Sequence, residues 1–187
     1  MRITKRLIIR PLELRDHENW RQAYSMMKPA QSEWDESSWK DAELTKLKFR
    51  KIVDEQKKYR KQDRFYSFAV FLKEDGVLIG AVDIMDVSRL RFQSAFLGYR
   101  IFNKYWGEGY AIEASRAALN IAFTDLKLHR IEAGIEPHNK VSIRVAKSIG
   151  LRKEGLSLRR ILHRGKWVDL MLFAATCEDF GLKYSLK

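Results

Sequence analysis

The chain has 187 residues, 45% of them hydrophobic, which is ordinary for one globular domain. It has no apolar run near the roughly 20 residues that span a bilayer, no signal-peptide pattern and a single cysteine, Cys177, so a membrane protein and a disulfide framework are excluded. Its 36 basic and 24 acidic residues give a net charge of +12, which favours polyanionic partners, although a basic surface also serves solubility alone. We expect a cytoplasmic protein.

The first third of the chain predicts one strand and helical segments. Residues 7–11 alternate as a strand, and Asp16 is placed to cap a helix over residues 16–26 whose inner face includes Trp20. Residues 35–62 are very polar and predict an exposed helix or helix pair. A thin apolar stripe runs through this stretch at Leu44, Leu47, Phe49, Ile52 and Tyr59.

The remainder predicts strands and helices in turn. The expected elements are strands at 66–72, 77–87 and 94–102, a long helix at 109–126, a strand at 130–136, a helix at 140–148 that ends at Gly150, and strands at 157–164 and 167–176. No low-complexity stretch or linker interrupts this order, so we predict an α+β fold in a single domain.

Two strand-to-helix junctions hold the strongest functional signal. At the first, Gly107 and Gly109 let bare backbone approach a ligand, and the N-terminus of the following helix attracts phosphate. At the second, Asn139 and Ser142 open the next helix with polar side chains. Together the junctions predict a phosphate-bearing cofactor held between them, although glycine is common at any tight turn. A dinucleotide fingerprint needs a third glycine and a P-loop needs Gly-Lys-Ser/Thr, so both are excluded.

These junctions carry a family resemblance. Lys104-x-x-Gly107-x-Gly109 resembles the Gln/Arg-x-x-Gly-x-Gly/Ala signature of the GNAT superfamily of N-acetyltransferases, and the segment from Asn139 to Leu151 is similar to its Asn-x-x-Ser…Glu-Lys-x-Gly-Phe pattern. The likeness to the ribosomal-protein-alanine and ribosomal-protein-serine acetyltransferase branch (RimJ and RimL) covers about residues 66–176. It lies in Leu97-Gly98-Tyr99, His129-Arg130-Ile131, Pro137-His138-Asn139-Lys140, Lys153-Glu154-Gly155 and Gly165-x-Trp167-x-Asp169, with fainter echoes in Arg6-Leu7-x-x-Arg10 and Lys28-Pro29.

The resemblance implies an architecture. It implies an α+β fold of the GNAT type, a three-layer α/β/α sandwich around a mixed, largely antiparallel twisted sheet that is splayed between its two central strands. It also implies one acetyltransferase domain over residues 1–187. Residues 1–65 would supply an N-terminal strand and acceptor-side helices, residues 66–176 the cofactor-binding and catalytic core, and residues 177–187 a C-terminal tail.

The resemblance further implies acetyl-CoA as co-substrate. The backbone amides of residues 107–111, with Lys104 beside them, would bind its pyrophosphate. Lys104 stands where the family has Gln or Arg, and this departure keeps a cation beside the phosphates. The implied cofactor-binding residues are Tyr99, Ile101, Lys104, Gly107, Glu108, Gly109, Tyr110, Ala111, Asn139 and Lys147. Asn139 also fits a plain helix N-cap.

Acetylation of an amine needs a neutral nitrogen and a stabilised leaving thiolate. An α-amine, with a pKa of about 7.7–8.0, is partly neutral at pH 7, so a weak or water-mediated base suffices. Many superfamily members use a Tyr seven residues after the Asn as general acid, but this chain has Ala146 there, so Ser142 is the candidate acid. Glu132 and Glu136, on one face of a strand, are candidate bases, with Asp83 as a third. Each carboxylate also fits a structural ion pair, and Ser142 also fits a capping hydroxyl.

Three residues are candidates for binding the acceptor: Trp34 in the variable helical region, Asp83 on a strand and Trp167 in the final hairpin. Aromatic side chains in such regions are also common in the core. His129 and His138 are interpreted as loop histidines that bond backbone, since direct attack by the amine needs no acyl-enzyme. No cluster of His, Asp and Glu at metal spacing appears in the sequence, so no metal is predicted.

The leading hypothesis is an N-acetyltransferase for the α-amine of a protein N-terminus, with a ribosomal protein that begins with Ala or Ser as acceptor. A small-molecule acetyltransferase for a polyamine or aminoglycoside-like amine stays open, although the charge of +12 disfavours a cationic acceptor. A ribosome-assembly factor with incidental acetylation also stays open. Expected partners are acetyl-CoA, the acceptor protein and, weakly, ribosomal RNA, with no membrane and with a monomer or homodimer as the assembly.

Overall fold

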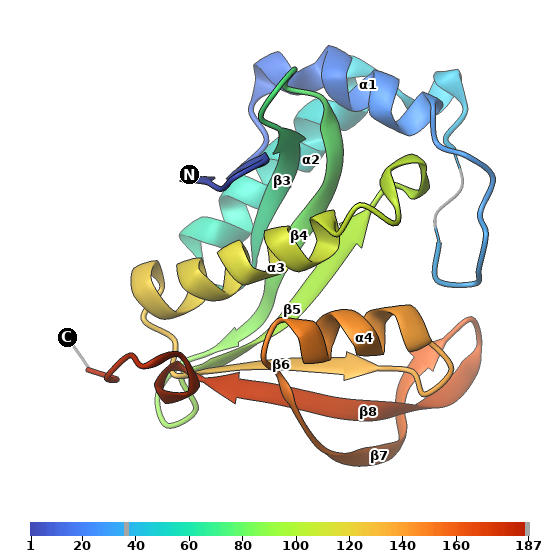
Figure 1. The fold of residues 1–187 in the computed structure, drawn as a ribbon. Helices are drawn as coiled ribbons and strands as arrows, with labels where there is room; N and C mark the ends of the chain where they lie inside the picture. The colour runs from blue at the N-terminus through green and yellow to red at the C-terminus, as the bar shows by residue number, and fades with distance from the viewer. Residues whose placement is uncertain (36–37, 186–187) are drawn as a thin grey trace. The chain divides into compact units, whose positions relative to one another are not determined.

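Eight strands and four α-helices form a mixed α/β fold in the described part of the chain, residues 1–35 and 38–185 of this computed structural model (Figure 1). The strands are β1 (Arg2–Ile3), β2 (Leu7–Arg10), β3 (Tyr66–Leu72), β4 (Leu78–Ser88), β5 (Ser94–Ile101), β6 (Arg130–Ile135), β7 (Arg152–His163) and β8 (Lys166–Thr176). The helices are α1 (His17–Ser25), α2 (Lys46–Lys61), α3 (Tyr110–Asn120) and α4 (Lys140–Ser148). None of the described helices has the length and apolar composition that crossing a membrane requires.

The sheet is open, mostly antiparallel and ordered β1-β2-β3-β4-β5-β6-β8-β7. The ladder between β5 and β6 is parallel and pairs Ser94 with Arg130, Ala95 with Ile131 and Phe96 with Glu132. Both strands run on beyond the last pair. The predicted mixed, largely antiparallel sheet is therefore confirmed.

The chain divides into two compact units. Unit 1 comprises Met1–Asp83 and Tyr99–Ala117, and unit 2 comprises Ile84–Gly98 and Ala118–Lys187. Strands β4 and β5 and helix α3 contribute to both units. The predicted single acetyltransferase domain, with limits at residues 65 and 176 between its parts, stays a prediction.

The core of unit 1 is aromatic. Trp20 and Tyr24 project from α1, as the periodicity predicts, and their ring centroids lie 5.5 Å apart. Phe49 of α2 is 5.1 Å from Trp20 and is 1% exposed. Asp16 precedes α1 as predicted, but its carboxylate does not cap the helix, because it binds Arg10 through two hydrogen bonds of 2.6 and 2.7 Å.

The polar stretch 35–62 holds a shorter helix than its pattern predicts. Within the described residues of this stretch, α2 covers only Lys46–Lys61, after a 3₁₀ turn at Asp41–Glu43. The expected stripe is wrong in part, since Leu47 and Tyr59 are exposed whereas Val53, which is not part of that stripe, is buried. Residues 36–37 of the stretch lie outside the described residues.

Strands β4 and β5 approach each other closely at Gly80. A Cβ added there would lie 2.1 Å from the carbonyl oxygen of Arg100 and 2.9 Å from the Cα of Ile101. Real Cβ atoms do not make such contacts, so this position requires glycine.

Unit 2 is built on the antiparallel strands β6, β8 and β7. β6 pairs with β8 over its full length, and β8 pairs with β7, with irregularities between Ser157 and Ile161. Helix α4 ends before Gly150, whose φ of +95° confirms the predicted left-handed cap. Two boundaries differ from the prediction: β7 begins at Arg152, earlier than residue 157, and the long helix 109–126 changes at Ile121–Asp125 into a π-helical turn.

Candidate active site

The loop between β5 and α3 has the features of the predicted phosphate-binding junction. Gly107 and Gly109 are exposed and have φ of +88° and +75°, a left-handed backbone that glycine adopts without strain. No atom lies within 4 Å of the position that a Cβ at Gly107 would take. Lys104 is exposed before the loop, and α3 begins at Tyr110 with N–H groups that lack intrahelical acceptors. Open backbone, free amides and a cation fit a pyrophosphate group.

Arg6, from the N-terminal segment, holds this loop in place. Its Nη1 donates to the carbonyl oxygen of Glu108 at 2.9 Å, and its guanidinium lies 4.5 Å from the centroid of the Tyr110 ring. Glu113 of α3 fixes Arg6 in turn, accepting from Arg6 Nε at 2.7 Å, from the Arg6 backbone N–H at 2.9 Å and from Thr4 Oγ1 at 2.6 Å. Burial alone would raise the pKa of Glu113, but these hydrogen bonds outweigh it and lower the pKa.

We expect Glu113→Ala to lower the free energy of unfolding by about 1–2 kcal/mol, because three donors lose their common acceptor. Urea denaturation monitored by circular dichroism measures the change. Glu18→Ala is the matched control and should leave the midpoint unchanged, since Glu18 is exposed and, in the described part of the chain, bonds only its helix neighbours Arg21 and Gln22. An equal loss in both variants would contradict the bracing role of Glu113.

Unit 1 also contains a cavity of about 320 Å³. Five aromatic side chains contribute to its wall: Trp20, Tyr24, Trp39, Phe65 and Phe102. Its polar lining comes from Gln56, Ser67, Asp83 and Arg100. The cavity is therefore mostly apolar with a few polar groups, which is typical of a small-ligand site.

Asp83 is the acidic group of this cavity. Burial raises its pKa to about 6, although a hydrogen bond from Ser67 acts in the opposite direction. Its Oδ1 atom is buried and has no hydrogen-bond partner among residues 1–35 and 38–185. Arg100 is engaged with the Tyr24 hydroxyl at 2.6 Å. A buried carboxylate in an apolar cavity, with a pKa close to neutral, is chemically suited to accept a proton.

The structure places the other predicted residues of unit 1 as follows. Tyr99 and Ile101 lie at the end of β5, where the Ile101 carbonyl accepts a 2.6 Å hydrogen bond from Trp106 Nε1. Trp34 is half-buried but does not line the cavity, where Trp39 contributes the indole instead.

In unit 2, Asn139 and Ser142 form the N-terminus of α4. The Oδ1 atom of Asn139 accepts a 3.0 Å hydrogen bond from the Ser142 backbone N–H, so Asn139 is the N-cap of this helix. Lys147, near the other end of α4, is exposed. The local sequence thus determines where α4 starts, whatever else Asn139 binds.

Replacing this cap gives a second stability prediction. Asn139→Ala should lower the free energy of unfolding by about 1 kcal/mol, whereas Asn139→Asp, which keeps a side-chain acceptor, should retain it. Thermal unfolding, followed by the circular-dichroism signal of the helices, measures the stability of both variants. Equal stability of all three proteins would show that the cap contributes nothing.

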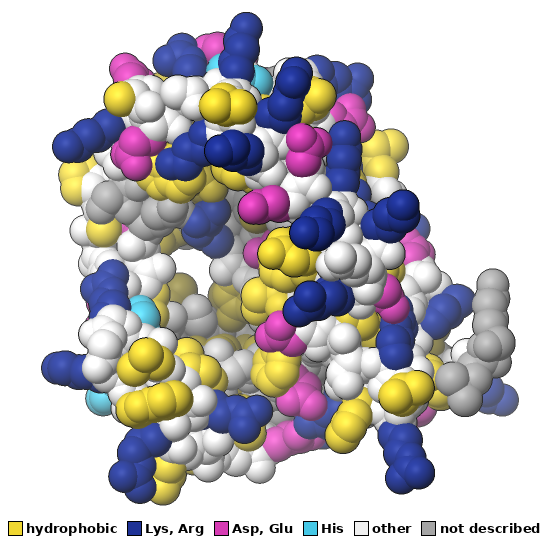
Figure 2. Space-filling model, turned by 180° about the vertical axis from the view of Figure 1, so that it is seen from behind, with side chains coloured by type: hydrophobic (Ala, Val, Ile, Leu, Met, Phe, Trp, Pro, Cys, Tyr) yellow, Lys and Arg dark blue, Asp and Glu magenta, His cyan; other side chains and the backbone are white. Residues whose placement is uncertain are grey.

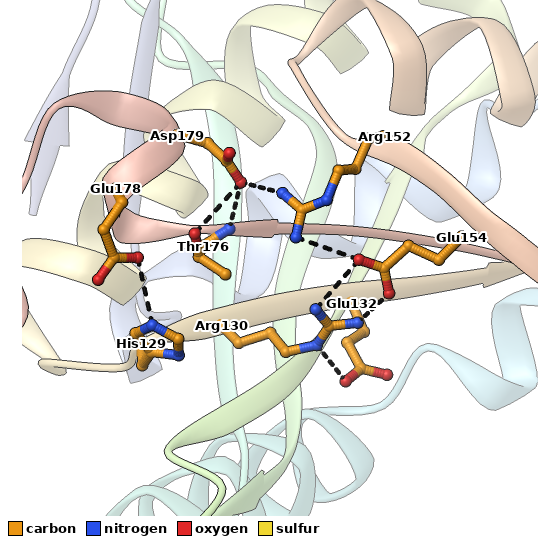
Figure 3. A network of polar contacts seen from close by, with 8 residues as sticks. All are labelled: His129, Arg130, Glu132, Arg152, Glu154, Thr176, Glu178 and Asp179. Atoms are coloured by element: carbon orange, nitrogen blue, oxygen red, sulfur yellow. Dashed lines mark hydrogen bonds and ion pairs between the residues drawn. The ribbon is translucent and has the colours of Figure 1, made fainter.

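The candidate bases of unit 2 each contact a nitrogen of a basic side chain. Glu132 accepts from Arg130 Nε at 2.7 Å, and Glu136 lies 2.5 Å from His163 Nδ1. Figure 3 shows that Arg130 also binds Glu154, and that Arg152 joins Glu154 to Asp179. The hydrogen bond to Glu154 is the main cause that raises the pKa of Arg130. This network fastens β6, β7 and the turn after β8 to one another.

His129, Cys177 and Glu178 come together at the end of β8. Their ligand atoms lie within 4.8 Å of one another, and His129 Nε2 is 3.2 Å from a Glu178 oxygen (Figure 3). The register that pairs Arg130 with Thr176 brings His129 opposite Cys177, a proximity that spacing along the chain does not reveal. The expectation that the protein binds no metal stays a prediction.

The comparisons with known proteins decide the family. A family model described as an acetyltransferase (GNAT) domain matches residues 6–152. The chain belongs to the GNAT acetyltransferase family. The probable N-acetyltransferase YjcK of Bacillus subtilis (strain 168) is 37% identical to this GNAT protein over 130 residues, which cover 70% of this chain and 72% of that protein.

Two further proteins are similar to this GNAT protein, one in sequence and one in structure. The ribosomal protein uS5-alanine N-acetyltransferase of Escherichia coli (strain K12) is 34% identical over 122 residues, which are 65% of this chain but only 63% of that relative's own length. The structure of Mycobacterium smegmatis RimJ, in complex with CoA-disulfide, has a TM-score of 0.77 at 26% identity and covers 95% of this chain and 85% of that one. The resemblance predicted from the motifs is confirmed.

Sequence reasoning missed several residues of the site. Arg6 was visible only as a faint motif echo, and its contact with Glu108 spans about a hundred positions. Ser67 gave no signal of a cavity, because alternating strand positions contain such residues routinely.

Proposed function

We propose that this GNAT protein transfers the acetyl group of acetyl-CoA to the α-amine at the N-terminus of a protein, with a ribosomal protein that begins with Ala or Ser as acceptor. The observation that carries the proposal is Asp83, a half-buried residue whose Oδ1 atom is buried and whose pKa is about 6, in a cavity walled by aromatic side chains. The similarity to the E. coli uS5-alanine N-acetyltransferase supports the choice of acceptor.

When bound, acetyl-CoA supplies the acetyl group as a thioester. In the proposal, the backbone amides from Gly107 to Ala111 bind the pyrophosphate, with Lys104 as the neighbouring cation. The open space at Gly107 and the bracing by Arg6 support this role. Tyr99, Ile101, Asn139 and Lys147 are proposed as further cofactor contacts.

The proposed chemistry is direct transfer. The amine nitrogen forms a bond to the acetyl carbon, and the carbon–sulfur bond breaks. Asp83 takes the proton that the amine loses, and Ser142 gives a proton to the departing sulfur. Because Glu132 and Glu136 are held by Arg130 and His163, we assign the proton of the amine to Asp83.

The pKa of Asp83 favours an α-amine over a lysine side chain. An α-ammonium with a pKa of about 7.7–8.0 lies about two units above Asp83, which corresponds to about 2–3 kcal/mol for the proton transfer. A lysine ammonium, with a pKa near 10.4, would require about 6 kcal/mol. The weaker base is therefore sufficient for a protein N-terminus.

The acceptor is tested by measuring free thiol released from acetyl-CoA with peptides that begin with Ala, Ser, Met or Asp, beside spermidine and an aminoglycoside. We expect turnover with the Ala and Ser peptides and its loss when their N-termini are blocked. Turnover with the small amines alone would contradict the peptide acceptor while leaving acetyl transfer intact.

A further inference from the structure

The hairpin of β7 and β8 exposes an unusual number of large apolar side chains. Leu156, Leu158, Ile161, Leu162 and Trp167 are each between 42% and 64% exposed. Register pairs Leu162 with Trp167 across the hairpin, and the other three residues lie on the same strand as Leu162, β7. Figure 2 shows hydrophobic side chains gathered at the lower left, over these strands. We call the five residues the hairpin patch. Contiguous exposed apolar groups of this kind mark interaction surfaces.

The same hairpin is rich in unpaired cations. Lys153, Arg159, Arg160, Arg164 and Lys166 are all exposed. Within residues 1–35 and 38–185, none of these five side chains forms an ion pair with a carboxylate. Asp169 accepts a hydrogen bond from the backbone N–H of Arg159 and not from its guanidinium. Arg152, at the base of the hairpin, is by contrast neutralised by Glu154 and Asp179 (Figure 3). The distal hairpin therefore attracts negative charge.

β7 is also the last strand in the sheet order, so its outer edge has no neighbouring strand within the described residues. The ladder between Arg152 and Ser157 is followed by an irregularity, and Arg159 has a φ of +48°. Such a kink hinders edge-to-edge pairing of identical strands, while the segment before it presents backbone groups to an incoming chain.

We propose that the β7–β8 hairpin docks an acidic protein segment that carries apolar side chains. Charge complementarity selects an acidic partner. Four of the five residues of the hairpin patch are aliphatic and one, Trp167, is aromatic, which favours a protein, because RNA is bound by stacking on successive aromatic rings and by cations. A second copy of this chain would bring its own unpaired cations against these. The docking does not depend on acetyl transfer and is measured without acetyl-CoA.

The probe is a short, fluorescently labelled peptide of Glu and Leu with an acetylated N-terminus, titrated with the full chain while its fluorescence anisotropy is followed. Arg159→Glu/Arg160→Glu should weaken binding by about tenfold or more. Lys51→Glu/Lys57→Glu on α2 is the matched control, because it changes the net charge equally at exposed positions and should change affinity less than about twofold. Near-equal losses in the two double variants would overturn the proposal.

A second variant separates docking from general charge attraction. Leu158→Ser/Leu162→Ser keeps every cation and replaces exposed side chains, so its thermal unfolding should be unchanged while peptide affinity falls by about tenfold. Three results would overturn the proposal: peptide affinity that does not respond to the Leu variant, tighter binding of an RNA oligomer than of the peptide, or a dimer in sedimentation that the Leu variant abolishes while the peptide fails to bind.

Discussion

Asp83→Asn is expected to lower kcat for peptide acetylation by about 10²–10⁴-fold, because the side chain that takes the proton from the amine is lost. Affinity for acetyl-CoA should be unchanged, since the proposed pyrophosphate loop does not include β4. Steady-state thiol release and calorimetric titration with CoA measure the two effects. Asp86→Asn is the matched control: Asp86 lies on the same strand, is exposed, and has a φ of +51° that Asn tolerates.

The pH dependence distinguishes a base from a merely structural group. Asp83 accepts a proton only when it is ionised, so kcat should rise with pH through about 6 in the unmodified enzyme. In Asp83→Asn this rise of kcat with pH should be absent. If Asp83→Asn keeps a near-normal kcat and the same rise of kcat with pH, the base lies elsewhere, and Glu136 is the next position to test.

Stability should move in the opposite direction from activity. The folded-state pKa of Asp83 is raised from its ordinary 3.8 to about 6, so the folded state favours the neutral carboxyl, and this contribution is lost as pH rises through about 6. Above that pH, the buried charge costs about 3 kcal/mol relative to an exposed carboxylate. Asp83→Asn removes the charge and should therefore not lower the denaturation midpoint at pH 8.

Gly80→Ala is expected to destabilise the protein by about 3 kcal/mol or more, because the new methyl group would lie 2.1 Å from the Arg100 carbonyl oxygen. Backbone cannot rotate out of the way as a side chain does, so β4 and β5 would have to move apart. Gly155→Ala on β7 is the control, since nothing lies within 4 Å of the added atom and its φ is not positive. Urea denaturation of the two variants checks the difference, and equal midpoints would contradict the close approach.

The elements with clear periodicity could be predicted from the sequence. Strand β3 and helix α4 have the expected bounds, because alternation and an Asn cap act within a few residues. The predicted helix over residues 35–62 was longer than α2, because charged residues are compatible with a helix almost as well as with an exposed loop. Its buried residue Val53 depends on packing against Trp20 and its neighbours, which local sequence does not specify.

In the site, too, the features that depend on local sequence could be predicted and those that depend on packing could not. The glycine loop was predictable because its φ angles are a local requirement. Asp83 could be named only as a third candidate base beside Glu132 and Glu136, since its pKa depends on burial by residues from distant parts of unit 1. Strand alternation places Arg130 and Glu132 on one face, but spacing could not show that Glu136 meets His163, because these two residues become neighbours only when the sheet forms.

The single cysteine makes the protein convenient for labelling. Cys177 is 2% exposed, and burial together with the neighbouring Glu178 raises the pKa of its thiol. A maleimide or disulfide reagent reacts with accessible thiolate, so the native chain should remain unlabelled at neutral pH. A cysteine introduced at an exposed position of the β7–β8 hairpin would then be the sole reactive thiol, and a dye placed there would report partner binding without removal of Cys177.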